Sequence, residues 1–260
     1  RDVAYPVLRS CSVFCRAYLT EGNDGKLHIA PTVSPEHWGI TPHFDKNRDC
    51  TSALTLTRYL LNRTADAADI LGLDSLESAE WRAAADRLVD FPTYETPDGP
   101  IWVDVAGAPP IEYNIAVPLS PVFWGDEVGL DSDEATLEIA RRTLSHIDVW
   151  QPHRFYLDRY VRPRLGICGT DSSLLPQHFI QSYQSIQLFP ALPAGAPARM
   201  ENMRTEGAFR VSASRNGDGI VRDVRIVSEA GGICTVASPW AGQTVVIRDA
   251  SGRTVLETSA

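Results

Sequence analysis

The chain has 260 residues, of which 43% are hydrophobic, so it can form one large domain or two smaller ones with a packed core. Its formal net charge is −9, its sequence pI is about 5.1 and it has no run of Lys or Arg, which argues against nucleic acid and anionic membranes as partners. No apolar run approaches the roughly 20 residues that span a bilayer, whereas a neutral polar ligand such as a sugar suits this composition. The first residue is Arg1 and not Met, so we expect a fragment or a processed product.

Residues 1–190 read mainly as helices joined by long loops. Apolar residues recur at helical spacing, which predicts helices over residues 3–18, 51–71, 74–88, 131–147 and 171–186. Pro152 is expected to open a further short helix that runs through Tyr160. Cys11 and Cys15 lie four residues apart on an apolar helix face, and we interpret them as small buried hydrophobic residues and not as a metal pair.

Capping motifs are expected at three of the helix starts. Asp74 precedes Glu77 by three residues and Asp131 precedes Glu134 in the same way, which is the spacing of a capping box. Asp171 or the serine that follows it is expected to cap the helix that leads to residue 186.

The pattern changes after residue 190. A segment rich in Ala, Pro and Gly at 191–198 has the composition of a linker, and beyond it apolar residues alternate with polar ones. The turn signal Asn216-Gly217-Asp218-Gly219 predicts a hairpin, and residues 245–256 predict another strand pair. We therefore expect a mainly α protein with a small antiparallel β module at residues 191–260.

The most informative stretch is residues 27–39, Leu-His-Ile-Ala-Pro-Thr-Val-Ser-Pro-Glu-His-Trp-Gly. It places the carboxyl group of Glu36 among His28, His37 and Trp38. A carboxyl held against an aromatic face loses hydration, which favours its protonated form and suits a general acid. From the residues alone, the alternative is a surface loop in which Pro, Ser and Glu shape a turn and cap a helix.

A second long loop region, residues 92–128, is rich in proline and aromatic residues, and such loops are often functional. Exposed rings can stack on the C–H faces of sugars, although each ring can equally pack over a helix end. The aromatic residues in question are Tyr94, Trp102, Tyr113, Phe123 and Trp124.

Four segments together resemble one family. They are Tyr5-Pro6-Val7-Leu8, residues 24–36 with their Ser-Pro-Glu end, the helix of residues 49–72, and residues 186–193 with the Leu-Phe-Pro-Ala-Leu-Pro run that leads to 207–211. In this order and spacing the chain resembles the C-terminal half of the catalytic region of glycoside hydrolase family 95. That family includes inverting α-L-fucosidases and α-L-galactosidases, and its members are often exported.

The resemblance implies both an architecture and a site. Residues 1–190 would form part of an (α/α)6 barrel, and residues 191–260 a small β-sandwich-like domain that follows it. Glu36 takes the general-acid role, the substrate is a fucosylated or related oligosaccharide, and the sugar pocket is expected to include His28, His37, Trp38, His43 and Trp124.

The sequence departs from the family pattern in three places. The Asn-rich motif that helps to hold the attacking water is expected upstream of residue 1. A His-rich loop is expected near residues 113–125, which here contain no histidine, and Arg164 falls at the position of the base. Asp171 is the nearest carboxylate and our first candidate for the base. Asp45 and Asp49 stand behind it, since either can instead bond to His43 or cap a helix.

Two functional hypotheses follow. The first is a glycosidase that resembles inverting α-L-fucosidases, and the second is a degenerate carbohydrate-binding relative, or an incomplete fragment, without a proper base. Motifs for nucleotide, flavin or zinc are absent from the sequence, so we expect no cofactor and no metal. The compartment is not indicated by the residues themselves.

Overall fold

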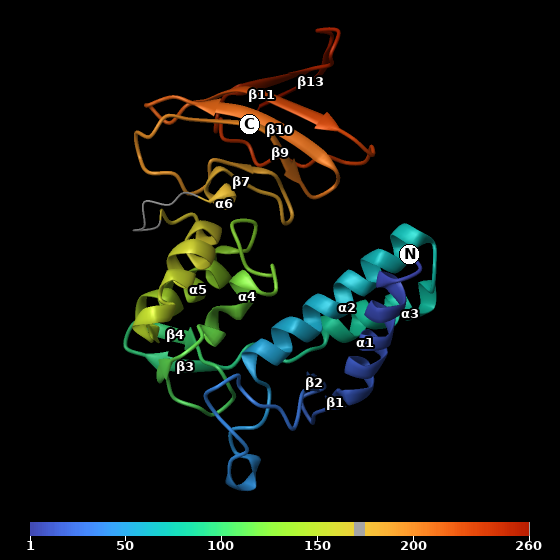
Figure 1. The fold of residues 1–260 in the computed structure, drawn as a ribbon, viewed down its shortest axis with the longest axis vertical. Coiled ribbons are helices and arrows are strands. Elements are labelled where there is room, and N and C mark those ends of the chain that lie inside the picture. Colours follow the sequence, from blue (N-terminus) through green and yellow to red (C-terminus); the bar gives the residue numbers. More distant parts are fainter. Residues whose placement is uncertain (169–174, 260) are drawn as a thin grey trace. The chain divides into compact units, whose positions relative to one another are not determined.

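The computed structural model describes residues 1–168 and 175–259 of the chain. Two compact units make up the chain, Arg1–Val161 and Arg162–Ala260. The mainly helical region and the small β module that the sequence predicts are both present (Figure 1). This division groups residues 162–190 with the strands that follow them, whereas a domain boundary at residue 190 stays a prediction from the sequence. Asp171 and its neighbouring serine lie outside the described residues.

The first unit contains four helices of 12 or more residues and several short elements. The helices are α1 (Ala4–Tyr18), α2 (Thr51–Leu71), α3 (Ser75–Asp86), α4 (Ser120–Phe123) and α5 (Glu134–His146). The short strands are β1 (Thr20–Glu21), β2 (Leu27–His28), β3 (Thr93–Thr96), β4 (Gly99–Trp102), β5 (Glu112–Tyr113) and β6 (Asp148–Val149). Single helical turns lie at Pro42–Phe44, Val117–Leu119 and Gln151–His153, and a π-helical turn lies at Leu157–Val161.

Helix α2 is the centre of this unit. Its expected apolar stripe of Leu54, Leu61, Ala65 and Ala68 is fully buried and packs against α1 and α3, which lie alongside it (Figure 1). The helix ends at Gly72, whose positive φ of 64° lets its backbone N–H bond the carbonyls of the last turn. The helical prediction for residues 51–71 is therefore confirmed.

Helix α1 also forms where it is predicted, but a different face of it is buried. Tyr5 and Ser12 face the unit's interior, and Ser12 Oγ donates to Thr64 Oγ1 of α2 at 2.8 Å. Cys11 is exposed and Cys15 is half-buried, so the expectation of two buried cysteines was wrong. The side of α1 that faces inward carries Tyr5, Leu8, Ser12 and Cys15, whereas Val7, Cys11 and Phe14 are exposed.

The two expected capping boxes do not form. Asp74 adopts a left-handed conformation and accepts a hydrogen bond from the Tyr5 hydroxyl at 2.7 Å, so α1 uses the carboxylate that the spacing assigned to α3. The cap of α5 is Asp133, which accepts from the backbone N–H of Thr136, and not Asp131. Both helices exist as predicted, but the Asp74 side chain does not cap α3, and a different carboxylate caps α5.

Strands β5 and β6 form a short parallel pair within the first unit. Glu112 lies opposite Asp148 and Tyr113 opposite Val149, and the N–H of Trp150 donates to the carbonyl of Tyr113 at 2.9 Å. The pair therefore places the residues that follow the two strands side by side, although they are far apart in the sequence.

The second unit is built on a three-stranded antiparallel sheet in the order β11-β10-β9. Its strands are β9 (Ala198–Thr205), β10 (Phe209–Arg215) and β11 (Val221–Ser228), and a separate pair is β12 (Thr244–Arg248) with β13 (Thr254–Ser259). The Asn216 turn joins β10 to β11 as predicted, and Asn216 Oδ1 accepts the N–H of Ile220 at 2.8 Å. Buried residues of β10 form the core of this unit with Ile186, Leu188 and Phe189.

The helix that the sequence predicts up to residue 186 is wrong over residues 180–186. The structure has a single turn, α6 (Pro176–Phe179), and then strands β7 (Ile180–Gln181) and β8 (Gln187–Leu188), with another single turn at Pro163–Leu165. Ile186 and Leu188 are buried against the sheet, so packing on β10 overrides the helical spacing. Among the described helices, none has the length and apolarity that crossing a bilayer requires.

Candidate active site

The loop that carries Glu36 is held at both ends by one buried amide. Asn47 Nδ2 donates to the carbonyls of Thr32 and Gly39, each at 3.0 Å, and its Oδ1 accepts the N–H of Thr41 at 2.8 Å. Because the amide is almost fully buried, these bonds form without competition from water. Asn47 thereby fixes where the loop begins and where it ends.

A buried carboxylate, Asp104, lies beneath this loop. Its side chain is fully buried and accepts from Ser34 Oγ at 2.9 Å and from Trp38 Nε1 at 3.1 Å. The backbone carbonyl of Asp104 also accepts the N–H of Thr51 at 2.9 Å, at the first residue of α2. These donors compensate for the cost of burying the carboxylate. Through its side chain and its backbone, Asp104 connects the Glu36 loop to the start of α2.

His37 bridges Asp104 and the loop after β5. The N–H of Asn114 donates to His37 Nε2 at 2.9 Å, while His37 Nδ1 lies 3.4 Å from Asp104 Oδ2. A backbone N–H can only donate, so Nε2 must be the acceptor and the ring proton belongs on Nδ1, toward Asp104. The ring also packs edge-on against Tyr113 at 5.1 Å between centroids. Burial, and then the charge of Asp104, raise the pKa of the Tyr113 hydroxyl well above its usual value.

Glu36 sits at the exposed tip of this assembly. Its φ is 64°, a left-handed conformation that is uncommon for a residue with a side chain. The amide of Asn114 donates to Oε2 of Glu36, so Asn114 holds both Glu36 and the neighbouring His37. The left-handed backbone and the bond from Asn114 fix the direction of an exposed carboxyl group, which is a property of positioned functional groups.

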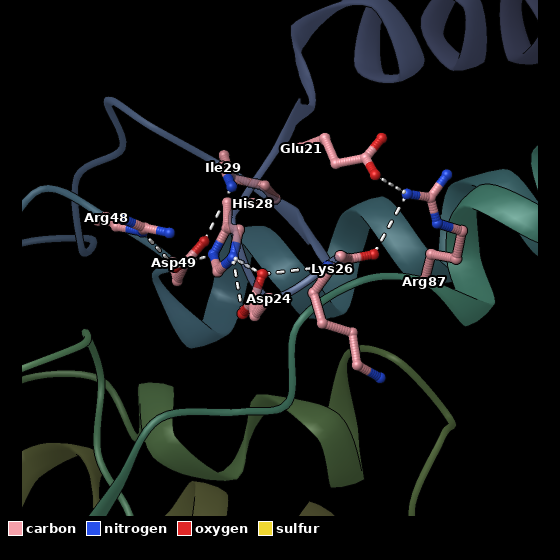
Figure 2. A network of polar contacts seen from close by, with 9 residues as sticks. Glu21, Asp24, Lys26, His28, Ile29, Arg48, Asp49 and Arg87 are labelled. Atoms are coloured by element: carbon pink, nitrogen blue, oxygen red, sulfur yellow. Dashed lines mark hydrogen bonds and ion pairs between the residues drawn. The ribbon is translucent and has the colours of Figure 1, made fainter.

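His28 belongs to a second polar network (Figure 2). Its Nδ1 lies 2.7 Å from Asp49 Oδ2 and its Nε2 lies 3.1 Å from Asp24 Oδ1, so each ring nitrogen faces a carboxylate. Asp49 also accepts the N–H of Ile29 at 2.9 Å and the Nε of Arg48 at 2.9 Å. Burial alone lowers the pKa of His28, but the bonds to Asp49 and Asp24 outweigh it, and the pKa is raised above its usual 6.5.

This second network borders a hollow of about 450 Å³. The hollow is lined by Thr20, Glu21, Asn23, Asp24, His28 and Arg48, with two further small residues. Asp49, one of the alternative base candidates, is fully engaged by His28, Arg48 and the Ile29 amide. It connects the residues just before α2 to His28 and Ile29, and its hydrogen bonds do not include Glu36.

The other expected site residues have different surroundings. His43 is exposed on the turn Pro42–Phe44, and Trp124 is half-buried against Phe123 at 5.0 Å. Asp45 is exposed, and bonds from Thr41 and Lys46 hold its pKa below the usual value. Asp171 lies outside the described residues. Of the expected pocket residues, His37 and Trp38 are thus the two that the structure joins to the Glu36 loop through Asp104 and Asn114.

Sequence reasoning missed Asp104, Asn114 and Asn47. Asp104 had a signal, because a lone carboxylate within Ile-Trp-Val-Asp-Val at residues 101–105 is a charge in a buried segment and needs partners. Asn114 had none, since Glu36 and His37 lie 78 and 77 residues away from it. Asn47 had none because its partners, 6 to 15 residues away, lie in a loop without a regular spacing. Within residues 1–168 and 175–259, no group of three or more His, Cys, Asp or Glu has the arrangement of a metal site.

A known family model matches part of the chain. The model of the glycosyl hydrolase family 95 catalytic domain matches residues 1–106. The matched region includes Glu36, Asp49 and Asp104 and ends before Asn114. No curated protein matches the chain.

Proposed function

We propose that this chain, whose residues 1–106 belong to the glycoside hydrolase family 95 catalytic domain, removes a terminal α-L-fucose from an oligosaccharide by inversion. Membership of that family makes the domain a glycoside hydrolase domain with a carbohydrate substrate. The finer proposal rests on one observation, the fixed and solvent-facing carboxyl of Glu36 on the loop that Asp104, His37 and Asn114 build.

Glu36 acts as the general acid in this proposal. Asn114 engages Oε2, which leaves Oε1 as the oxygen that carries the proton to the glycosidic oxygen. As the bond between that oxygen and the anomeric carbon breaks, a water attacks the anomeric carbon from the opposite face and gives its proton to a base. The products are free fucose with inverted configuration and the shortened oligosaccharide.

The mechanism also needs a carboxylate that acts as the general base. An inverting enzyme keeps its two carboxyl groups roughly 6.5–9.5 Å apart, with room for the water between them. Asp171 is our first candidate from the sequence. Asp49 is a poorer candidate, because His28 and Arg48 occupy its Oδ2.

We also propose the family architecture for the whole chain. Residues 1–190 would contribute helices to an (α/α)6 barrel, and residues 191–260 would form the β domain that follows it. The pocket would include Trp38 and His37, which share the buried Asp104 contact, with His28, His43 and Trp124 as further candidates for its wall.

The test compares Glu36→Gln with the wild-type chain on an aryl α-L-fucoside and on an α-1,2-fucosylated trisaccharide. We expect kcat/KM on the trisaccharide to fall about 10²- to 10⁴-fold, the usual contribution of a general acid. The exposed Glu80→Gln variant on α3 is the matched control and should retain wild-type rates. Product configuration is followed by NMR and should be inverted.

A substrate with a different leaving group separates the acid from the base. Fluoride leaves without protonation, so α-L-fucosyl fluoride should be hydrolysed by Glu36→Gln far better than the trisaccharide is. A base variant such as Asp171→Asn should lose activity on both substrates. Equal losses on both substrates in Glu36→Gln would contradict its role as the acid.

The second candidate function is a carbohydrate-binding relative without catalysis. It is favoured by Arg164, which stands at the family's base position and stacks on the Tyr183 ring at 4.3 Å instead of presenting a carboxylate. Absence of turnover with sugar binding retained would favour this function. Loss of both turnover and binding would indicate that this chain is an incomplete piece of a larger enzyme.

A further inference from the structure

A row of exposed aromatic rings follows strand β6. Trp150 packs edge-on against His153 with centroids 5.1 Å apart, Phe155 stacks on Tyr156 at 4.2 Å, and Tyr156 lies 5.9 Å from Tyr160. Trp150 is 50% exposed, Phe155 42%, and the two tyrosines 38% each. The rings thus touch one another in sequence while each keeps a large part of its surface in water.

This row is connected to Glu36 by two hydrogen bonds. Because β5 and β6 are parallel and in register, Trp150 lies beside Asn114, the residue after the partner strand. His153 Nδ1 lies 2.7 Å from the Asn114 carbonyl oxygen, and the Asn114 side chain donates to Glu36. The same residue therefore fixes the carboxyl of Glu36 and the near end of the aromatic row.

The backbone that carries the row is irregular. A 3₁₀ turn at Gln151–His153 is followed by the π-helical turn Leu157–Val161. π-Helical turns are rare and occur frequently at functional sites. Leu157 and Val161 of this turn are buried, whereas Tyr160 between them is exposed, so the turn anchors the backbone and turns a tyrosine outward.

The chemistry of the row suits a carbohydrate. A sugar ring offers an apolar C–H face and a rim of hydroxyls, and a Tyr or Trp ring offers an apolar face with one polar group. The guanidinium of Arg159 lies 5.8 Å from the Phe155 ring, beside the row. The row and Glu36 share Asn114 as a hydrogen-bond partner.

We propose that Trp150, Tyr156 and Tyr160 bind the sugar rings of the leaving group, on the far side of the bond that Glu36 cleaves. The assignment to the leaving group rests on the proposed function, whereas binding of sugar by the row can be measured without turnover. The occupant is an uncharged oligosaccharide chain, and the row selects for substrates that are longer than the fucose unit.

The first experiment measures binding directly. The fucose-free disaccharide, which is the product of cleaving the trisaccharide, is titrated against wild type, Trp150→Ala and Tyr156→Ala and followed by NMR. Each variant should weaken binding about 3- to 10-fold, as expected from the loss of one ring contact. Tyr94→Ala, which removes a ring that is 44% exposed on β3, is the matched control and should leave the affinity unchanged.

The second experiment separates this proposal from the catalytic one. The ratio of kcat/KM for the trisaccharide to kcat/KM for α-L-fucosyl fluoride should fall in Trp150→Ala and Tyr156→Ala, because the fluoride offers no ring to the row. If Glu36→Gln leaves turnover unaffected but the row variants lose disaccharide binding, sugar binding by the row is supported and the role of Glu36 as the acid is contradicted. If the variants bind the disaccharide like wild type, or alter self-association in sedimentation instead, the proposal is overturned.

Discussion

Nδ1 of His28 lies 2.7 Å from Oδ2 of Asp49, and both side chains are almost entirely buried. Asp24 faces the other ring nitrogen at 3.1 Å, and Arg48 Nε donates to the same oxygen of Asp49 that His28 faces. Two carboxylates on one imidazole favour the doubly protonated ring, which joins the β1–β2 hairpin to the residue ahead of α2 (Figure 2).

This network makes stability depend on pH. The pKa of His28 is raised above its unfolded value of 6.5, so its contribution is fully present below about pH 6.5 and is lost as pH rises through the folded pKa. The pKa of Asp24 is lowered by its bond from His28, so that contribution is lost instead as pH falls below 3.8. Urea unfolding should therefore show a free energy of unfolding that declines above neutrality. His28→Gln should flatten the decline, whereas His146→Gln, whose ring faces the exposed Asp98, should retain it.

Gly22 leaves room for the same network. A Cβ at this position would lie 2.6 Å from His28 Nε2 and 2.7 Å from Asp24 Oδ1. Gly22→Ala should separate the pair and lower the free energy of unfolding by about 1–3 kcal/mol, the usual cost of overpacking. Gly39→Ala meets no atom within 4 Å and should change stability by no more than about 0.5 kcal/mol. Equal effects of the two substitutions would count against a close fit at Gly22.

Removing the charge of Asp104 should destabilise the Glu36 loop. Asp104→Asn keeps one acceptor oxygen but places an amide NH2 against Ser34 Oγ or Trp38 Nε1, which both donate to the present carboxylate. We expect a loss of about 1–3 kcal/mol in thermal or urea unfolding, together with a lower kcat/KM on the fucosylated trisaccharide. Asp90→Asn, at an exposed position, is the control for the same chemical change. A fully wild-type activity in Asp104→Asn would remove this residue from the account of the loop.

Asn114 should set the pH range of catalysis. Asn114→Asp replaces an amide donor with a second carboxylate against Glu36, and a like charge favours the protonated form of its neighbour. The alkaline limb of the kcat/KM profile should move to higher pH on the fucosylated trisaccharide. Asn23→Asp adds the same charge at an exposed position and should leave the profile in place. An unshifted profile in Asn114→Asp would argue that Glu36 does not set that limb.

Local patterns predicted the elements whose contacts are local or repeat with a short period. The stripe of α2 and the Asn216 turn are found as predicted, because helix periodicity and turn chemistry act within a few residues. The family resemblance added Glu36 as a candidate, and the match of the family 95 catalytic-domain model over residues 1–106 supports that resemblance.

The remaining features depend on partners that spacing does not encode. Asp74 has the spacing of a helix cap, yet it bonds the hydroxyl of Tyr5, which lies 69 residues away. The helix predicted through Ile186 fails because Ile186 packs on the second unit's sheet. Asp104 and Asn114 reach the Glu36 loop across separations of 70 and 78 residues, which no local pattern reports.

Those separations fix the order in which the site can be assembled during synthesis. A nascent chain that has emerged as far as residue 106 contains Glu36 and Asp104 but lacks Asn114, and the β6 strand that pairs with β5 emerges later still. Loop closure over such distances costs entropy before its contacts form, so the acid loop reaches its final geometry after the three-helix core of α1, α2 and α3. The carboxyl of Glu36 is therefore oriented only after strand β6 has been synthesised, more than a hundred residues after Glu36 itself.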